Sequence, residues 1–190
     1  MKNILFFLYE DMADFEVTLV AHILGAGGEE AYKITPIAYT LDPIRSKCGL
    51  VYLPEKTVDE VLDQETEGLI IPGGFNMDAR PHLITLIQKL YKEKKLVSAI
   101  CAAPYYLAKA GILDHHRFAT SLANWSDDHK ALYGEDPFPR ENYVNDRVMI
   151  DKNVITAKGV AFIDFAIAIT KYLKLYSDED IEEYKKILKG

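Results

Sequence analysis

Cysteine is scarce in this sequence, because the 190-residue chain contains only Cys48 and Cys101. Two thiols do not make the disulfide framework of a small secreted domain. Long apolar runs are also absent, since no stretch approaches the ~18 residues of a membrane-spanning helix. Residues 1–16 hold one lysine and a short apolar run that ends in acidic residues, without the longer apolar region of a secretory signal. We therefore expect a cytoplasmic protein with reduced thiols that does not enter a membrane.

Positive charge is in deficit as well. The chain has 22 basic and 29 acidic residues, a net charge of −7. A nucleic-acid-binding surface or a polybasic membrane contact needs the opposite sign, so we expect neither. Solubility is the simplest explanation of the acidity. Repeats, linkers and low-complexity stretches are missing too, and we predict one domain over residues 1–190, a length that suffices for a substantial core.

The sequence does contain a repeated alternation of short apolar runs and amphipathic segments. Continuous apolar runs are typical of strands buried on both faces, and apolar residues at helical spacing indicate helices that cover them. This alternation predicts a mostly parallel sheet with helices on both faces. The expected strands are 3–9, 33–40, 50–54, 68–75 and 96–100, and the expected helices are 14–28, 57–63, 82–95 and 102–113.

The pattern changes towards the C-terminus. Residues 147–159 contain two strand-like runs around Asp151-Lys152-Asn153, which predicts a β-hairpin. Segments 160–174 and 177–190 then read as helices, the second with Ser177 as its N-cap. The predicted fold is therefore an α/β, flavodoxin-like sandwich that closes with a C-terminal hairpin and helices.

A cysteine marks one joint between a strand and a helix. Cys101 follows the apolar run 96–100 and precedes a helix whose first turn contains Pro104. At such a joint the backbone is strained, and the side chain projects into the crevice where parallel α/β sheets bind ligands. A helix N-terminus also stabilises a thiolate, which predicts an accessible and acidic thiol. A buried, inert cysteine is the competing interpretation.

A nucleophile at this joint needs an oxyanion site and a proton partner. The segment "IIPGGF" ends a neighbouring strand, so the N–H groups of Gly73 or Gly74, together with that of Ala102, are candidate oxyanion donors. Glu16 lies near the start of the first helix in an apolar setting, where a raised pKa suits a carboxyl that shares a proton with the thiol. An acid that only stabilises the start of a helix, and an ordinary Pro-Gly-Gly turn, remain the alternatives.

Four segments together resemble the ThiJ/PfpI superfamily, which includes the Parkinson-associated deglycase. They are "ADFE" (13–16), "IIPGGF" (70–75), "AICAAPYYLAKAGIL" (99–113) and the stretch 145–173. The resemblance spans nearly the whole chain and implies a flavodoxin-like fold, usually as a homodimer. By position it implies that Cys101 is the nucleophile, Glu16 its hydrogen-bonded carboxylate and Gly74 an oxyanion donor.

The chain departs from that family in its histidines. Some members carry histidine directly after the cysteine, where this chain has Ala102, and others carry it twenty residues later, where Ser121 stands. His129 is the next candidate, but it falls on an expected separate helix that begins at Ser126 or Asp127, and we assign it no role. Glutamine amidotransferases share the fold, but they need a histidine beyond the hairpin. The last histidine of this chain is His129, before the hairpin, so we set that function aside.

Five further residues are predicted to line the pocket. Gly73 and Phe75 belong to the Pro-Gly-Gly turn, and Ser121, Asn124 and Trp125 belong to the loop that overhangs the cysteine in the family. For Trp125, ordinary core packing is an equal alternative.

Three functions fit these residues. The first is a cofactor-free enzyme, with no metal, in which Cys101 attacks a small electrophilic carbonyl-like substrate and Glu16 moves the proton. The second is a redox-sensing or chaperone-like stress protein that uses reversible oxidation of Cys101. The third is an amidase or peptidase, which the missing histidine disfavours.

Overall fold

A seven-stranded sheet forms the centre of the computed structural model, which describes residues 2–27 and 31–190. The strand order is β5-β2-β1-β6-β7-β9-β8, and all pairs are parallel except the antiparallel β8–β9 hairpin. The mostly parallel sheet and the C-terminal hairpin are therefore confirmed. The strands are β1 (Asn3–Phe7), β2 (Lys33–Ala38), β5 (Lys56–Thr57), β6 (Gly68–Ile71), β7 (Leu96–Ile100), β8 (Val148–Asp151) and β9 (Val154–Ala157).

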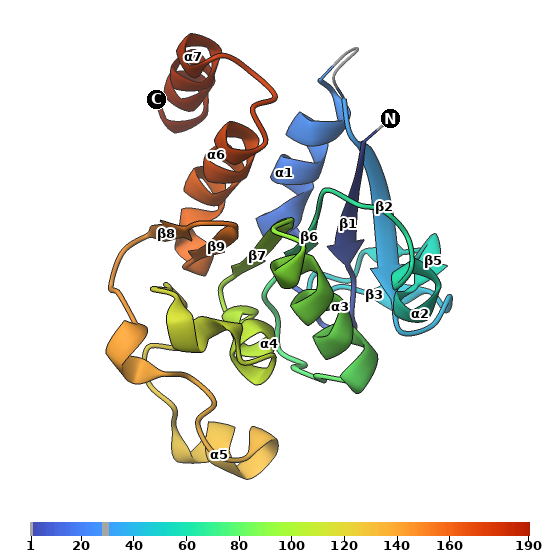
Figure 1. The fold of residues 1–190 in the computed structure, drawn as a ribbon, viewed down its shortest axis with the longest axis vertical. Helices are drawn as coiled ribbons and strands as arrows, with labels where there is room; N and C mark the ends of the chain where they lie inside the picture. Colours follow the sequence, from blue (N-terminus) through green and yellow to red (C-terminus); the bar gives the residue numbers. More distant parts are fainter. Residues whose placement is uncertain (1, 28–30) are drawn as a thin grey trace.

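Helices cover both faces of this sheet (Figure 1). Every residue of β6 and β7 is buried, which explains why these strands read as continuous apolar runs. On one face α1 (Phe15–Gly25) packs against α6 (Phe162–Tyr172), and α7 (Asp178–Lys189) packs on α6. The opposite face is covered by α2 (Val58–Val61), α3 (Pro81–Lys92) and α4 (Pro104–Lys109).

Two expected elements differ in the structure. The strand expected at 50–54 is only β4 (Val51–Tyr52), which pairs antiparallel with β3 (Ile44–Arg45) outside the main sheet, and the short β5 takes the sheet edge instead. The helix expected at 102–113 ends at Lys109, because Gly111 adopts a left-handed conformation with φ +73°. A 3₁₀ turn, η2 (Ile112–His115), follows it.

Helix ends follow the local sequence closely. Thr57 and Glu60 form a reciprocal capping box at α2, and Ser177 caps α7, as predicted. The helix expected over 14–28 is α1, which ends at Gly25, while Gly28 lies outside the described residues. Among the described residues, no helix has the length and apolar character needed to cross a bilayer.

The order of the strands positions the candidate site. β1, β6, β7 and β9 are consecutive neighbours in the sheet, and all four run in the same direction. Their carboxyl ends therefore meet at one edge. The start of α1, the Pro-Gly-Gly turn, Cys101 and the 3₁₀ turn η4 (Gly159–Ala161) all follow these strands, so the chain brings them together there.

Candidate active site

Cys101 occupies the joint between β7 and α4 in a left-handed conformation, with φ +63°. This conformation costs a non-glycine residue roughly 1–3 kcal/mol, so the surroundings must hold it in place. They do so through three hydrogen bonds to its backbone. The Cys101 N–H donates to the carbonyl of Ala157 at 2.8 Å, and the Cys101 carbonyl accepts from the Ser121 N–H at 2.8 Å and the Thr120 hydroxyl at 2.7 Å.

Glu16 lies against this cysteine although the two are far apart in the sequence. Glu16 is only 2% exposed, and its carboxylate accepts a hydrogen bond from the thiol of Cys101. Oε2 of Glu16 also accepts the N–H of Gly73 at 2.8 Å. The first turn of α1 thus supplies a buried carboxyl that is held by the Pro-Gly-Gly turn and faces the sulfur.

Two glycines permit this close approach. A Cβ on Gly73 would lie 2.4 Å from the Cβ of Cys101 and 2.6 Å from Oε2 of Glu16. A Cβ on Gly159 would lie 2.6 Å from Oε1 of Glu16 and 3.0 Å from Sγ of Cys101. At each position at least one of these separations is shorter than real Cβ contacts, so a side chain would force its neighbours to move. The sequence interpretation missed Gly159, which is signalled only by its place after the last strand of the hairpin.

Burial raises the proton affinity of both ionisable groups. Burial raises the pKa of Glu16, against the hydrogen bonds from the Cys101 thiol and the Gly73 N–H. Burial and then the negative charge of Glu16 raise the pKa of Cys101 to about 11. The acidic thiol expected from the sequence is therefore not found, because α4 has only six residues and its N-terminus does not offset burial. At neutral pH the thiol of Cys101 therefore keeps its proton.

The sulfur also has donors that stabilise a thiolate. The Ser121 hydroxyl and the Ala102 N–H both contact Sγ of Cys101 and lower its pKa, against the larger effects of burial and charge. The Ser121 hydroxyl in turn accepts the N–H of Gly159 at 3.0 Å. Ser121 stands where some members of the superfamily have histidine, and here it links the sulfur to η4.

The three N–H groups expected to stabilise an oxyanion, those of Gly73, Gly74 and Ala102, differ in their hydrogen-bond partners. The N–H of Ala102 is directed at the sulfur, and that of Gly73 is taken by Glu16. Gly74 pairs with Met12 in an antiparallel bridge whose hydrogen bonds belong to the flanking residues, and its own N–H has no acceptor among the described residues. A Cβ on Gly74 would lie 2.8 Å from the Cα of Met12, so glycine is required. Gly74 lines the cavity above Cys101.

That cavity has a volume of about 680 Å³, within the usual range for small-molecule sites. Phe75 and Ser121 line it, as predicted. Gly73 does not line it, because its backbone is turned to Glu16. The full lining comprises Ala13, Phe15, Glu16, Gly74, Phe75, Met77, Cys101, Ala102, Ser121, Leu122, Asp128, His129, Leu132, Tyr133, Gly159, Val160 and Phe162. Over residues 2–27 and 31–190, no three His, Cys, Asp or Glu side chains are grouped to hold a metal ion.

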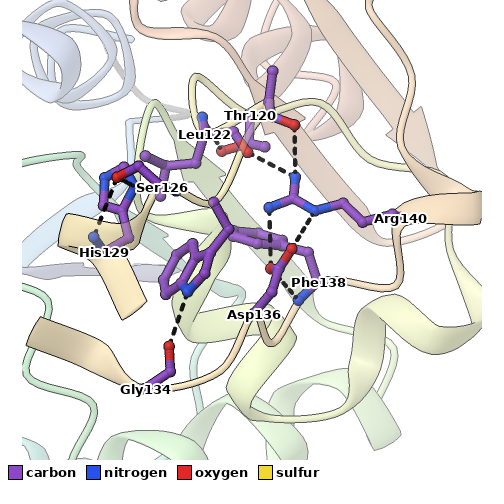
Figure 2. A network of polar contacts seen from close by, with 10 residues as sticks. Thr120, Leu122, Ser126, His129, Gly134, Asp136, Phe138 and Arg140 are labelled. Carbon is purple, nitrogen blue, oxygen red and sulfur yellow. Dashed lines mark hydrogen bonds and ion pairs between the residues drawn. The ribbon is translucent and has the colours of Figure 1, made fainter. Parts of the chain in front are cut away.

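Asn124 and Trp125 were expected in this cavity, but they line a different one that also contains Arg140. The reason is the packing of Trp125. Its indole N–H donates to the carbonyl of Gly134 at 2.9 Å, the dashed line to Gly134 in Figure 2. Its ring stacks on Tyr105, with centroids 5.9 Å apart. The indole also stacks on His129, with ring centroids 5.1 Å apart. Trp125 therefore packs against His129, which lines the cavity, and does not line the cavity itself.

His129 lines the cavity, although the sequence analysis gave it no role. It lies on α5 (Asp127–Tyr133), which Ser126 caps as expected. Nδ1 of His129 accepts the N–H of Ser126 at 3.2 Å, so the neutral ring carries its proton on Nε2 (Figure 2). The Ser-x-x-His spacing of this capping box is the sequence signal that fixes the ring.

An ion pair anchors the segment that carries α5. Nε and Nη2 of Arg140 bind the two carboxylate oxygens of Asp136 at 2.7 and 3.0 Å (Figure 2). Nη1 of Arg140 donates to the carbonyl of Leu122 at 2.7 Å. These bonds tie both ends of the segment 122–140 together and hold α5 at the rim of the cavity.

Comparison with known protein families gives a match over most of the chain. The DJ-1/PfpI family model matches residues 2–172. The chain belongs to the DJ-1/PfpI family. The resemblance noted in the sequence is thereby confirmed.

Individual relatives match most of the length of this chain. The DJ-1 superfamily protein Atu0886 of Agrobacterium tumefaciens has a TM-score of 0.80 at 28% identity, with 99% of this chain and 97% of that chain covered. An uncharacterized protease of Bacillus subtilis, YdeA, is 27% identical over 187 residues, which are 96% of this chain and 89% of YdeA. The glutathione-independent glyoxalase DJR-1.2 of Caenorhabditis elegans is 26% identical over 170 residues, which are 87% of this chain and 84% of that protein.

Proposed function

We propose that the chain is a cofactor-free, cysteine-dependent enzyme that acts on a small electrophilic carbonyl compound. The observation that carries this proposal is the buried pair of Cys101 and Glu16, joined by a hydrogen bond below a cavity of small-molecule size. The relative named glutathione-independent glyoxalase makes 2-oxoaldehydes the first substrates to test.

The chemistry would begin with addition of the thiol to the aldehyde carbon. The S–C bond forms as the thiol proton passes to Glu16, and the negative charge on the former carbonyl oxygen faces the N–H of Gly74. Return of the proton to that oxygen gives a thiohemiacetal. Glu16 is placed for this transfer because it contacts the sulfur and its pKa is raised by burial.

The thiohemiacetal then isomerises. A base removes the hydrogen on C1 as a proton, and the electron pair moves towards the C2 carbonyl to give an enediolate. A proton returns to C2 and the hydroxyl proton on the C1 oxygen passes to the C2 oxygen, which leaves a 2-hydroxy thioester of the same composition. Water hydrolyses the thioester to a 2-hydroxy acid and regenerates the Cys101 thiol. One water molecule is consumed overall, and no external oxidant or reductant is required.

The test measures methylglyoxal consumption and lactate formation. Wild-type protein is expected to form lactate, whereas Cys101→Ser is expected to form none. Cys48→Ser is the matched control, because the exposed Cys48 has no place in the cavity, and it should retain full activity. Lactate formation by Cys101→Ser would overturn the proposal. Hydrolysis of a small amide series with no action on aldehydes would favour the amidase or peptidase alternative.

Redox sensing is the second candidate, and the surroundings of the sulfur favour it. The Ala102 N–H, the Ser121 hydroxyl and a protonated Glu16 all lie where they can bond to oxygen atoms added to Cys101. Intact-mass analysis after dilute peroxide should show one or two oxygen atoms added in wild type and Cys48→Ser, and none in Cys101→Ser. Oxidation confined to Cys48 would exclude this candidate.

The family resemblance also supports a homodimer in the cytoplasm as part of the proposal. Exposed apolar side chains of the segment around β4, at Leu50, Val51 and Leu53, offer an apolar surface for a second copy. Sedimentation equilibrium tests this part. A single species at the chain mass of 21.5 kDa would rule out the dimer.

A further inference from the structure

The walls of the Cys101 cavity are far more apolar than a small aldehyde needs. Phe15 and Phe162 meet edge to face, with centroids 5.4 Å apart and an interplanar angle of 83°. Aromatic and aliphatic side chains provide most of the remaining lining, namely Phe75, Met77, Leu122, Leu132, Tyr133 and Val160. A three-carbon substrate leaves most of a space of about 680 Å³ empty, and burial of apolar surface by a larger substrate would be favourable.

The mouth of the cavity is apolar as well. Phe75, Leu132 and Val160 come from the Pro-Gly-Gly turn, α5 and η4, and they are 65%, 73% and 75% exposed. Exposed apolar side chains that gather at one opening, as these three do, commonly mark a ligand-binding or partner-binding site. Because all three also line the cavity, an apolar group that enters towards Cys101 would pass between them.

Charge within the cavity favours an uncharged ligand. Glu16 and Asp128 are acidic, and the described lining contains neither lysine nor arginine. The nearby ammonium of Lys47 lies over the ring of Phe75, 4.8 Å from its centroid, and is paired with Asp11 at 3.6 Å. A carboxylate or phosphate bound near Cys101 would lose water without gaining a lysine or arginine partner from the lining.

We infer that this cavity selects uncharged carbonyl substrates that carry an aromatic or branched apolar group, and discriminates against substrates that carry a carboxylate or phosphate. The inference rests on the proposed function for its account of turnover, but the selectivity is a property of the walls. It is therefore testable by the reactivity of Cys101 alone, without any aldehyde.

The experiment compares three alkylating probes on Cys48→Ser protein: N-benzyliodoacetamide, iodoacetamide and iodoacetate. Each rate at Cys101 is divided by the rate with N-acetylcysteine in the same buffer, which removes the intrinsic reactivity of the probe. We expect the benzyl probe to be favoured over iodoacetamide by about tenfold, and iodoacetate to be disfavoured by about tenfold, the size of effect that apolar pockets produce. Normalised rates that are equal for all three probes would overturn the inference.

A substitution at the mouth tests the cause of the discrimination. Leu132→Lys places a cation there and should restore most of the normalised iodoacetate rate, while Leu132→Gln, of similar size but neutral, should not. The exposure of Leu132 makes both changes tolerable for the fold. Equal effects of the two substitutions would overturn the inference. A benzyl probe slower than iodoacetamide would also overturn it, because a second copy seated over the mouth would exclude the bulkier reagent.

Turnover separates this inference from the proposed function. The value of kcat/KM should be highest for phenylglyoxal, lower for methylglyoxal and lowest for 4-carboxyphenylglyoxal. If aldehydes are consumed without this order and the probes show no preference, the inference fails and the proposed function stands. If the probes show the preference but no aldehyde is consumed, the proposed function fails and the selectivity of the cavity stands.

Discussion

The backbone N–H of Gly73 donates a 2.8 Å hydrogen bond to Oε2 of Glu16, a residue 57 positions earlier in the chain. This bond joins the turn after β6 to the first turn of α1. It fixes the carboxyl beside the sulfur of Cys101, at a distance that a side chain on Gly73 would prevent. The geometry of the pair therefore depends on a residue that has no side chain.

Gly73→Ala is expected to destabilise the protein by about 1–3 kcal/mol, the usual cost of overpacking a filled site. The new methyl group would lie 2.4 Å from the Cβ of Cys101, and both neighbours would have to move. Urea unfolding at neutral pH measures this cost. Gly25→Ala is the matched control, since its Cβ would meet Ile34 at an ordinary 3.6 Å. An equal loss of stability in the two variants would contradict the steric explanation.

Glu16→Gln is expected to lower turnover by roughly 10²–10⁴-fold, the usual range for losing a general acid–base group. The same change should lower the pKa of Cys101 from its value of about 11, because the negative charge of Glu16 is one of the causes that raise it. Thiolate absorbance between about pH 8 and 12 measures the shift.

Two further variants make the Glu16 experiment specific. Cys101→Ser provides the blank for the absorbance. Glu16→Asp keeps the charge but shortens the side chain by one methylene, so turnover should fall while the pKa of the thiol stays raised. Superimposable titration curves for wild type and Glu16→Gln would show that Glu16 does not act on Cys101.

Local sequence signals predicted much of the fold because they act at short range. Apolar runs marked the buried strands β1, β6 and β7, and Thr57 with Glu60 marked the start of α2. The β3–β4 hairpin was missed, because two-residue strands leave too short a pattern to distinguish from a loop. The position of Cys101 at a strained joint followed from the same local reasoning.

The rest of the site depends on contacts between distant segments. The pKa of Cys101 is set by how deeply β7 and its neighbours bury the sulfur, and the start of a helix in the sequence does not reveal this. The closeness of Gly159 to Glu16, and the separation of Trp125 from the cavity, arise from tertiary packing. His129 reaches the cavity because the ion pair between Arg140 and Asp136 holds the segment that carries α5. No pattern in the sequence predicts this ion pair.

His129→Ala is expected to loosen α5, because the side chain of His129 accepts the N–H of its N-cap residue, Ser126. Ser126 still caps the helix through its hydroxyl, so only the reciprocal bond of the capping box is lost, at a cost of roughly 0.3–1.5 kcal/mol. α5 buries none of its residues, so the loss should appear as faster amide hydrogen exchange in 127–133 with little change in global stability. His129→Gln keeps an acceptor at the same position and should exchange like wild type. Equal exchange in both variants would exclude the capping role.

The raised pKa of Cys101 has a consequence for stability at alkaline pH. An unfolded cysteine loses its proton near its ordinary value of 9.0, whereas folded Cys101 keeps its proton until about pH 11. Between these values the folded state binds more protons than the unfolded state, so the free energy of unfolding falls as pH rises. The contribution of Cys101 is complete below pH 9 and is lost by about pH 11. A shift of this size corresponds to about 2–3 kcal/mol.

The expected result is a smaller decline for Cys101→Ser than for wild type when urea unfolding is followed from pH 8 to 11. Tyr9 and Tyr106 also have pKa values raised chiefly by burial, and they steepen the decline in every variant. The charge of Cys101 is a minor cause of the raised pKa of Tyr9, so its loss in Cys101→Ser should reduce the decline further, in the same direction. Cys48→Ser, which changes the exposed thiol, should decline like wild type. Parallel curves for wild type and Cys101→Ser would contradict the assignment, because the folded and unfolded states would then release the Cys101 proton at the same pH.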